Sequence, residues 1–403
     1  MFTLSFRNLL RNRIRTTITL AAIVFGVSGL VVSGGFVRDI FIQLGEALIH
    51  SQSGHAQIGQ AAIFTHGSRS PERHLLEDHE ALRAELLATS GVRDAMARIA
   101  FSGLLNNGRT DYAILAEGIE PERELRLGTH LRMKAGRALQ PDDTFGAMIG
   151  EGVAHALQLA PGDKATLLVS TIDGAMNTLD IEIVGVFQTF SKDFDARAVR
   201  IALADAQILL DTSGVSKLVV SLDDTALTDA FVGAARARLS TQDLSVLDWR
   251  ELNDFYEKTV DLYAQQFGFL KAMVLLMVCL SVINAVNMSL MERTWEFGTM
   301  RALGNKNTTV VSLIVYESTL IGLFGATFGV VAGISIALFI SGIGIPMPPP
   351  PNSEMGYDAY IRLAPDIIVE AWFVGIIACV LAAILPAWRA TRMSIIDALR
   401  GRE

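Results

Sequence analysis

The sequence lacks the patterns that enzymes and nucleotide-binding proteins need. It has no GxxxxGK[ST] phosphate loop, no nucleophile elbow and no HExxH zinc motif. Five of its seven histidines fall close together, but their spacing fits no compact metal site, and they are His50, His55, His66, His74 and His79. We therefore expect no catalytic residues, no metal and no cofactor on this chain, and histidines that are solvated or packed in a core.

The long polar segment 38–266 has no cysteine and fewer basic than acidic residues. The only cysteines, Cys279 and Cys379, fall in apolar runs, so the polar segment 38–266 must rely on its own core, for which its 229 residues suffice. That segment holds 21 basic and 33 acidic residues, a net charge of −12. An acidic segment argues against nucleic acid as a partner.

Long apolar runs are abundant, since 51% of the 403 residues are hydrophobic. Four runs are long enough to cross a hydrocarbon core of about 30 Å as helices. The polar segments at the two ends and before the third run hold eleven bases and four acids, so the positive-inside rule makes them cytoplasmic. The first run could be a cleaved signal peptide, but its length favours a retained span.

These runs predict the domain order. It is a basic cytoplasmic N-terminus (1–15), transmembrane helix 1 (16–36), a stalk (37–50), an outer domain (51–250), a second stalk (251–266), transmembrane helix 2 (267–291), a cytoplasmic loop (292–309), transmembrane helix 3 (310–342), a Pro-rich outer loop (343–366), transmembrane helix 4 (367–386) and a cytoplasmic tail (387–403).

The outer domain mixes strand and helix patterns. Hairpins are expected across Asn106-Asn107-Gly108 and across Asp173-Gly174. Helices are expected over 76–90, 150–159 and 227–239, and further strands over 217–222 and 244–247. The predicted fold class is an α-helical membrane protein with four transmembrane helices and a large, two-lobed extracytoplasmic α+β domain between helices 1 and 2. A β-rich lobe, about 120–200, is inserted into the other lobe.

Apolar residues at helical spacing continue from the spans into this domain. Phe41 and Leu44 follow the first span, and Tyr263 and Phe267 lead into the second. We interpret these stretches as stalks with apolar stripes that face a cargo. The alternative, that the stripes pack only against their own domain, stays open.

The third span carries small residues and one acid. Gly325, Gly329 and Gly333 form a stripe for close helix packing, either between subunits or within one. Glu317 is costly in a span unless it is paired, so we expect Arg301 or a partner subunit as its counter-ion, unless Glu317 is simply exposed at the membrane interface.

The short charged segment 291–306 lies between the second and third spans. Trp295 and Phe297 alternate there with charges, as in an amphipathic helix at a membrane interface. The segment is either a docking surface for a cytoplasmic partner or an ordinary turn.

Several motifs together resemble the MacB/FtsX superfamily of ABC-transporter permeases, also called type VII, over nearly the whole chain. They are the basic entry 7–13 (RNLLRNR), the segment 296–304 (EFGTMRALG) against the pattern E-x-G-x-x-R-A-x-G, the acid Glu317, and the C-terminal stretches 386–390 (PAWRA) and 397–400 (DALR).

The resemblance implies a permease subunit driven by mechanotransmission. The residues of this chain that would contact and couple to a cytoplasmic ABC ATPase are Glu296, Phe297, Gly298, Arg301 and Gly304. That ATPase is expected to be a separate chain that binds ATP and Mg, and a second permease, identical or related, is expected as a partner. The implied location is the bacterial inner membrane, with both termini cytoplasmic and a MacB-like periplasmic domain.

The layout is most similar to stand-alone LolC/LolE-type permeases, which implies that a lipoprotein or lipid is extracted from the outer leaflet. A periplasmic carrier or adaptor could be a further partner. The alternatives are MacB-like efflux of peptides or drugs with a periplasmic adaptor, and FtsX-like regulation of a cell-wall hydrolase.

Overall fold

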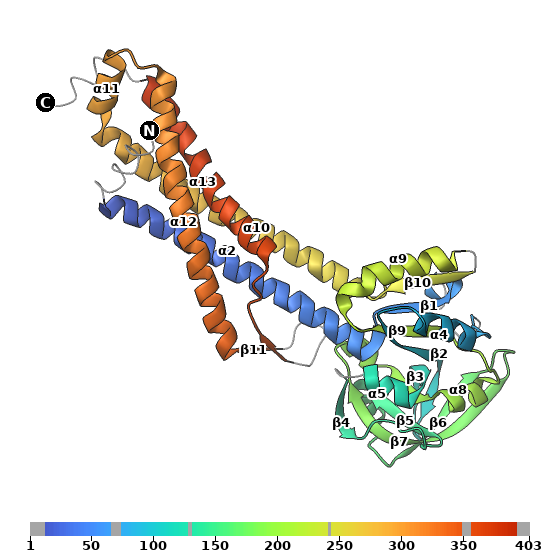
Figure 1. Ribbon diagram of the computed structural model, residues 1–403. Coiled ribbons are helices and arrows are strands. Elements are labelled where there is room, and N and C mark those ends of the chain that lie inside the picture. The colour runs from blue at the N-terminus through green and yellow to red at the C-terminus, as the bar shows by residue number, and fades with distance from the viewer. Residues whose placement is uncertain (1–12, 66–73, 128–130, 241–242, 349–355, 393–403) are drawn as a thin grey trace. The chain divides into compact units, whose positions relative to one another are not determined.

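The computed structural model describes residues 13–65, 74–127, 131–240, 243–348 and 356–392 (Figure 1). Some predicted features lie outside the described residues: Arg7, Arg11, His66, part of the proline run and the stretch 397–400. The chain divides into two compact units. The first comprises residues 1–41, 259–347 and 358–403, and the second comprises residues 42–258 and 348–357.

Long helices build the first unit. They are α2 (Arg13–Leu48), α10 (Asp254–Glu292), α12 (Asn307–Ile343) and α13 (Pro365–Arg392), with the short helix α11 (Thr294–Ala302) between α10 and α12. The short strands β11 (Ile345–Met347) and β12 (Tyr357–Ala359) pair with each other. Each long helix contains a stretch that is long and apolar enough to cross a membrane, which agrees with the four predicted spans.

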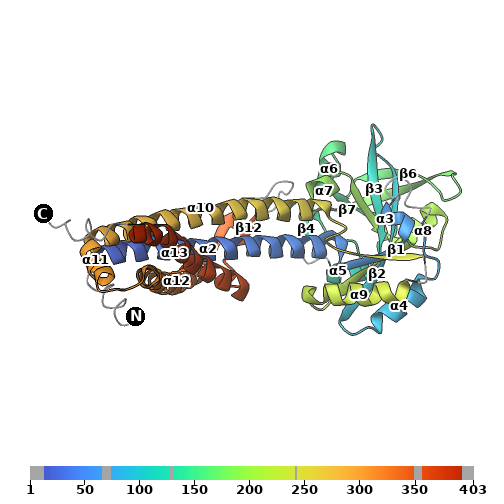
Figure 2. The same cartoon turned by 90° about the horizontal axis from the view of Figure 1, so that it is seen from above.

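The long helices pack through small and β-branched residues. Figures 1 and 2 show α2 running beside α10, and a Cβ at Gly26 of α2 would lie 3.0 Å from Val278. The helices share a buried apolar core with members from α2, α10, α12 and α13, among them Ile23, Val278, Leu313 and Ala382. Both α2 and α10 continue past the predicted spans without a break, so the stretches predicted as stalks are helical.

A mixed sheet of ten strands organises the second unit, in the order β10-β1-β9-β2-β3-β8-β5-β7-β4, with β6 pairing with β2 and β7. The strands are β1 (Ala56–Gln60), β2 (Val92–Asn106), β3 (Asp111–Ile119), β4 (Arg132–Gly136), β5 (Gly146–Gly150), β6 (Lys164–Ser170), β7 (Met176–Gln188), β8 (Ala198–Ala202), β9 (Lys217–Leu222) and β10 (Leu244–Asp248). The pairs β3–β8 and β5–β7 are parallel.

Short helices cover this sheet. They are the π-helix η1 (Ile49–Ser53) that ends α2, α3 (Ala61–Thr65), α4 (His79–Leu87), α5 (Pro121–Leu127), α6 (Glu151–Leu157), α7 (Lys192–Asp195), α8 (Leu203–Leu210), the 3₁₀ turn η3 (Thr225–Leu227) and α9 (Thr228–Leu239).

Two apolar cores flank the long strand β2. Its start, at Ala95 and Ala97, packs with α4 and α9, and its later part, from Ile99, packs with α6, α8 and strands β5 to β8. The sheet runs without a break across the limits predicted for the inserted lobe, and the second core includes β3 before residue 120 and α8 after residue 200. Strand β2 therefore belongs to both cores.

Both predicted hairpins are present, as β2–β3 and β6–β7. In the first, the Asn107 side chain accepts hydrogen bonds from the backbone N–H groups of Arg109 and Thr110, and Gly108 has a φ of +85°. That φ favours glycine, which is why the Asn-Gly pair was a reliable signal.

Candidate functional site

The short helix α11 joins α10 to α12 and has clear start and stop signals. Arg293 interrupts the helical path between α10 and α11. At the other end, the N–H of Asn305 donates to the carbonyl of Met300 at 3.1 Å, and the N–H of Gly304 donates to that of Arg301 at 3.0 Å. With a φ of +89° at Gly304, these bonds form a Schellman motif. Gly304 thus ends α11.

Arg293 links α11 to α12 through hydrogen bonds. Its side chain is only 6% exposed and donates to Glu296 on α11 at 2.8 Å and to Glu317 on α12 at 2.9 Å. The guanidinium also lies over the Phe297 ring, 5.1 Å from its centroid. One buried cation therefore connects the junction, α11 and α12.

This geometry corrects the expected counter-ion of Glu317. The sequence favoured Arg301 or a partner subunit, with simple exposure as an alternative, but the Glu317 side chain is 14% exposed and pairs with Arg293. Arg293 is close to Glu317 because the helical path breaks directly before α11, and that break could not be located from the sequence. Sequence reasoning therefore missed Arg293 as a site residue.

The other predicted coupling residues lie on both sides of α11. Phe297 and Gly298 are buried against the bundle, whereas Glu296 and Arg301 are partly exposed and Gly304 is exposed. Two apolar side chains of the same segment point outward, with Trp295 49% exposed and Leu303 79% exposed. The segment thus has an anchored inner side and an accessible outer side.

The glycine stripe of α12 packs within the chain. A Cβ built at Gly325, Gly329 or Gly333 would lie 2.8, 2.7 or 2.9 Å from Ile23, Val27 or Val31 of α2, respectively. Of the two possibilities left open by the sequence, packing inside one subunit is the one this structure contains.

The predicted cargo-facing residues have different surroundings. Phe41 and Tyr263 are partly exposed and meet edge to face, with ring centroids 5.8 Å apart, and Phe267 is also partly exposed. Leu44 is buried with Phe190 and Tyr256 in the second unit, so in this structure it offers no surface to a cargo.

Buried charges hold the end of α2 in the second unit. Arg98 of β2 donates to the carbonyl of Gln52 at 2.6 Å, and Arg200 of β8 donates to that of Ser51 at 3.3 Å. Both carbonyls belong to the π-helix η1, where helix carbonyls lack intrahelical partners and carry partial negative charge. Glu124 of α5 accepts from Arg98 through both carboxylate oxygens.

A central carboxylate balances these cations. Glu117 of β3 lies 3.6 Å from Arg98, 3.4 Å from Arg200 and 3.5 Å from Lys217. Burial alone would raise the pKa of Glu117, but the three cations outweigh it and lower that pKa to about 2. The carboxylate is therefore ionised throughout the ordinary pH range.

Two family matches identify the chain. Residues 16–238 match the MacB-like periplasmic core domain, and residues 268–395 match the FtsX-like permease C-terminal region. The chain belongs to the MacB/FtsX family of ABC-transporter permeases. The four candidate spans and the α/β domain between the first two agree with this family.

The permease is similar to proteins with different stated roles. It is 23% identical to an uncharacterized ABC transporter permease of Methanocaldococcus jannaschii, over 100% of this chain and 98% of that one. It is 22% identical to the lipoprotein-releasing system transmembrane protein LolC of Xylella fastidiosa, over 84% and 85% of the two chains. It is 24% identical to the macrolide export ATP-binding/permease protein MacB of Hyphomonas neptunium, over 98% of this chain but 60% of that one.

One histidine of the permease, His55, has a structural role in the second unit. His55 is buried, its Nδ1 accepts from the N–H of Leu222 at 3.1 Å, and its Nε2 lies 3.2 Å from the Thr225 hydroxyl. Burial lowers the pKa of His55 to about 4, so the ring is neutral at pH 7. Among the described residues, no group of three or more His, Cys, Asp or Glu could hold a metal ion.

The glycine stripe of the permease gives a testable expectation. Gly329→Ala would place a methyl group 2.7 Å from the Cβ of Val27, so we expect a destabilisation of about 1–3 kcal/mol, the usual cost of overpacking. Gly342→Ala on the same helix is the matched control, because a Cβ there meets no described residue within 4 Å. Thermal unfolding in detergent measures both, and equal midpoints for the two variants would contradict the packing described here.

Proposed function

We propose that this permease couples ATP hydrolysis in a separate cytoplasmic ABC ATPase to extraction of a lipoprotein or lipid from the outer leaflet of a bacterial inner membrane. The ATPase would bind the ATP and Mg, and motion at α11 would pass through the long helices to the outer domain. In this proposal α11 and both termini are cytoplasmic and the second unit is periplasmic, in keeping with the net charges of those segments.

One observation carries the coupling part of the proposal, namely the two-sided construction of α11. Its inner side is fixed by Phe297 and by the Arg293 pairs to Glu296 and Glu317. Its outer side offers Trp295 and Leu303 to a partner. A force on the exposed side would thus act directly on α10 and α12, which is what mechanical coupling requires.

The cargo part rests on apolar surface and on the similarity to LolC. Around the Phe41–Tyr263 contact, α10 also exposes Leu262 and Phe269. Acyl chains need such a surface, whereas a hydrophilic solute does not. LolC is by name a lipoprotein-releasing protein. A second permease, identical or related, and a periplasmic carrier would complete the proposed assembly.

Docking at α11 can be tested by purification. We expect the wild-type chain, taken from its native membrane in mild detergent, to retain an ABC ATPase. A Trp295→Asp, Leu303→Asp variant should retain at least tenfold less, because two apolar contacts of about 1.4 kcal/mol or more in total are lost. Ile208→Asp, an exposed apolar residue on α8, is the control and should bind as wild type. Equal ATPase recovery in all three samples would refute docking at α11.

Mass spectrometry of the same purified sample tests the cargo. A retained lipoprotein or diacyl lipid supports the proposal. A periplasmic adaptor with a peptide or drug would instead favour efflux, as the similarity to a macrolide export protein suggests. A cell-wall hydrolase without lipid would favour a regulatory role.

A further inference from the structure

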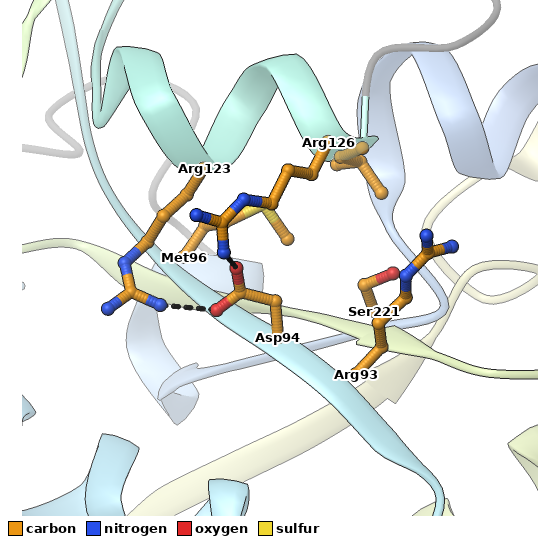
Figure 3. Close-up of a pocket in the computed structure, with 7 residues that line it drawn as sticks. Arg93, Asp94, Met96, Arg123, Arg126 and Ser221 are labelled. Carbon is orange, nitrogen blue, oxygen red and sulfur yellow. Dashed lines mark hydrogen bonds and ion pairs between the residues drawn. The ribbon is translucent and has the colours of Figure 1, made fainter. Parts of the chain in front are cut away.

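A polar pocket of about 120 Å³ lies in the second unit, between helix α5 and strands β2 and β9. Strands β2 and β9 and helix α5 line it with Arg93, Asp94, Met96, Arg123, Arg126, Leu127 and Ser221 (Figure 3). Three arginines against one aspartate give the lining a net charge of +2. The volume suits one small polar group.

A β-bulge explains how neighbouring residues come to line the same pocket. In the β2–β9 pairing, Val92 faces Leu222 and Asp94 faces Ser221, so Arg93 is the extra residue of an irregular register. Consecutive side chains of a regular strand point to opposite faces, whereas a bulge redirects one of them. Arg93 and Asp94 therefore both line this pocket.

Asp94 positions two of the arginines. Figure 3 shows Arg123 and Arg126 converging on its carboxylate. One carboxylate oxygen accepts from Arg123 and from the N–H of Ala95, while the other lies 3.5 Å from Arg126 and accepts no hydrogen bond among the described residues. Arg126 is only loosely held by Asp94, and its pair with Glu122 at 3.1 Å is exposed to solvent. It thus has spare donor capacity.

Two more donors in the pocket are unused. Within the described residues, the exposed guanidinium of Arg93 has no acidic partner, and the hydroxyl of Ser221, a residue only 5% exposed, makes no hydrogen bond. The Ser221 hydroxyl therefore opens toward the pocket, where it can donate to a bound group. Met96 and Leu127 add apolar lining next to these donors.

We propose that this pocket binds a phosphate group. Arg93 and Ser221 would donate to it directly, and Arg126, oriented by Asp94, would complete the site. Arg93 has no acidic partner among the described residues and Arg126 is only weakly paired, so these two guanidiniums suit a phosphate monoester, which carries about −1.5 to −2 at pH 7, better than a single carboxylate. Arginine is well suited to phosphate because its planar fork donates two parallel hydrogen bonds. The phosphate could belong to a soluble ester or to a phospholipid headgroup.

Binding is tested with the full chain in a nonionic detergent, by titrating glycerol 3-phosphate and following its ³¹P linewidth. We expect saturable binding that weakens about tenfold or more in Arg93→Gln and several-fold in Ser221→Ala, because each loses a hydrogen bond to a charged group. Arg109→Gln, an exposed arginine in the β2–β3 turn, should bind as wild type. Arg93→Lys should recover part of the affinity.

The source of the phosphate is tested with vesicles of phosphatidylcholine that contain one-tenth phosphatidic acid. Binding that needs Arg93 and exceeds that of glycerol 3-phosphate assigns a lipid headgroup, and binding of the soluble ester alone assigns a soluble ligand. No saturable binding of either probe, unchanged binding in Arg93→Gln, or equal affinity for succinate would overturn the proposal. Arg93 has no side-chain partner in the part of the chain that the structure describes, so the unfolding midpoint of its variants should equal that of wild type, which separates lost binding from misfolding.

Discussion

Glu117→Gln is expected to destabilise the second unit by about 3–5 kcal/mol, the usual cost of breaking a buried ion pair from one side. The substitution removes the carboxylate that Arg98, Arg200 and Lys217 share. Arg98 still contacts the carboxylate of Glu124. For a domain of this size, the midpoint of thermal unfolding should fall by on the order of 10 °C. The exposed Glu182 of β7 offers a control, since Glu182→Gln should leave the midpoint nearly unchanged.

The same substitution predicts a pH dependence. Because the folded-state pKa of Glu117 is lowered from 4.5 to about 2, its contribution is fully present above pH 4.5 and is lost as the pH falls toward 2. The difference in unfolding midpoint between wild type and Glu117→Gln should therefore be largest near pH 7 and shrink below pH 4.5. A difference that stays constant down to pH 3 would show that Glu117 does not interact with these cations as described.

Arg293→Met is expected to have a comparable effect on the first unit. It removes the cation that Glu317 contacts at 2.9 Å and leaves a mostly buried acid in a candidate span, at a cost of about 3–5 kcal/mol. We also expect α11 to lose its link to α12, so that a retained ATPase would hydrolyse ATP at a rate independent of this chain. Thermal unfolding and ATPase assays of the purified complex measure the two effects separately.

A double variant separates the ion pair from other roles of Arg293. Arg293→Met combined with Glu317→Leu removes both charges, and apolar replacements of a buried pair are often nearly neutral, so most of the stability should return. Arg301→Met on α11 is the matched control, because Arg301 was the partner favoured by the sequence. If Arg301→Met proved as damaging as Arg293→Met, and the double variant showed no recovery, the assignment of Arg293 would be wrong.

Local signals in the sequence were sufficient for much of the fold. The four apolar runs predicted the long helices, and the turns at Asn107-Gly108 and Asp173-Gly174 predicted both hairpins. Strands β1, β4, β5 and β8 were missed. In β5 and β8 both faces are buried, so no alternation of polar and apolar residues marks them, although the equally buried β9 was predicted. In β8 the buried Arg200 further obscures the pattern.

The site was predictable only where it depends on local sequence. The helix α11 agrees with the amphipathic segment expected there, but Trp295 and Phe297 were both expected at the interface and only Trp295 is exposed. The Arg293–Glu317 pair depends on where α10 ends, and the polar pocket depends on a bulge in β2. Neither feature has a signature in the sequence. The partner of the glycine stripe could not be chosen because Ile23, Val27 and Val31 look like any other residues of an apolar span.

That stripe also bears on how the register of the helices is fixed. The residues of α2 repeat at the same four-residue interval as the glycines they face, so α2 displaced by one interval, about 6 Å, would meet an equivalent surface. The stripe by itself leaves these registers nearly degenerate, and the close approach of Gly26 to Val278 is one apolar contact that disfavours the shift. Polar contacts resolve the degeneracy, because buried Asp39 accepts from the N–H of Tyr360 and from the Arg362 side chain, and Gly35 accepts from the N–H of Arg362. The segment before α13 therefore sets the axial position of α2.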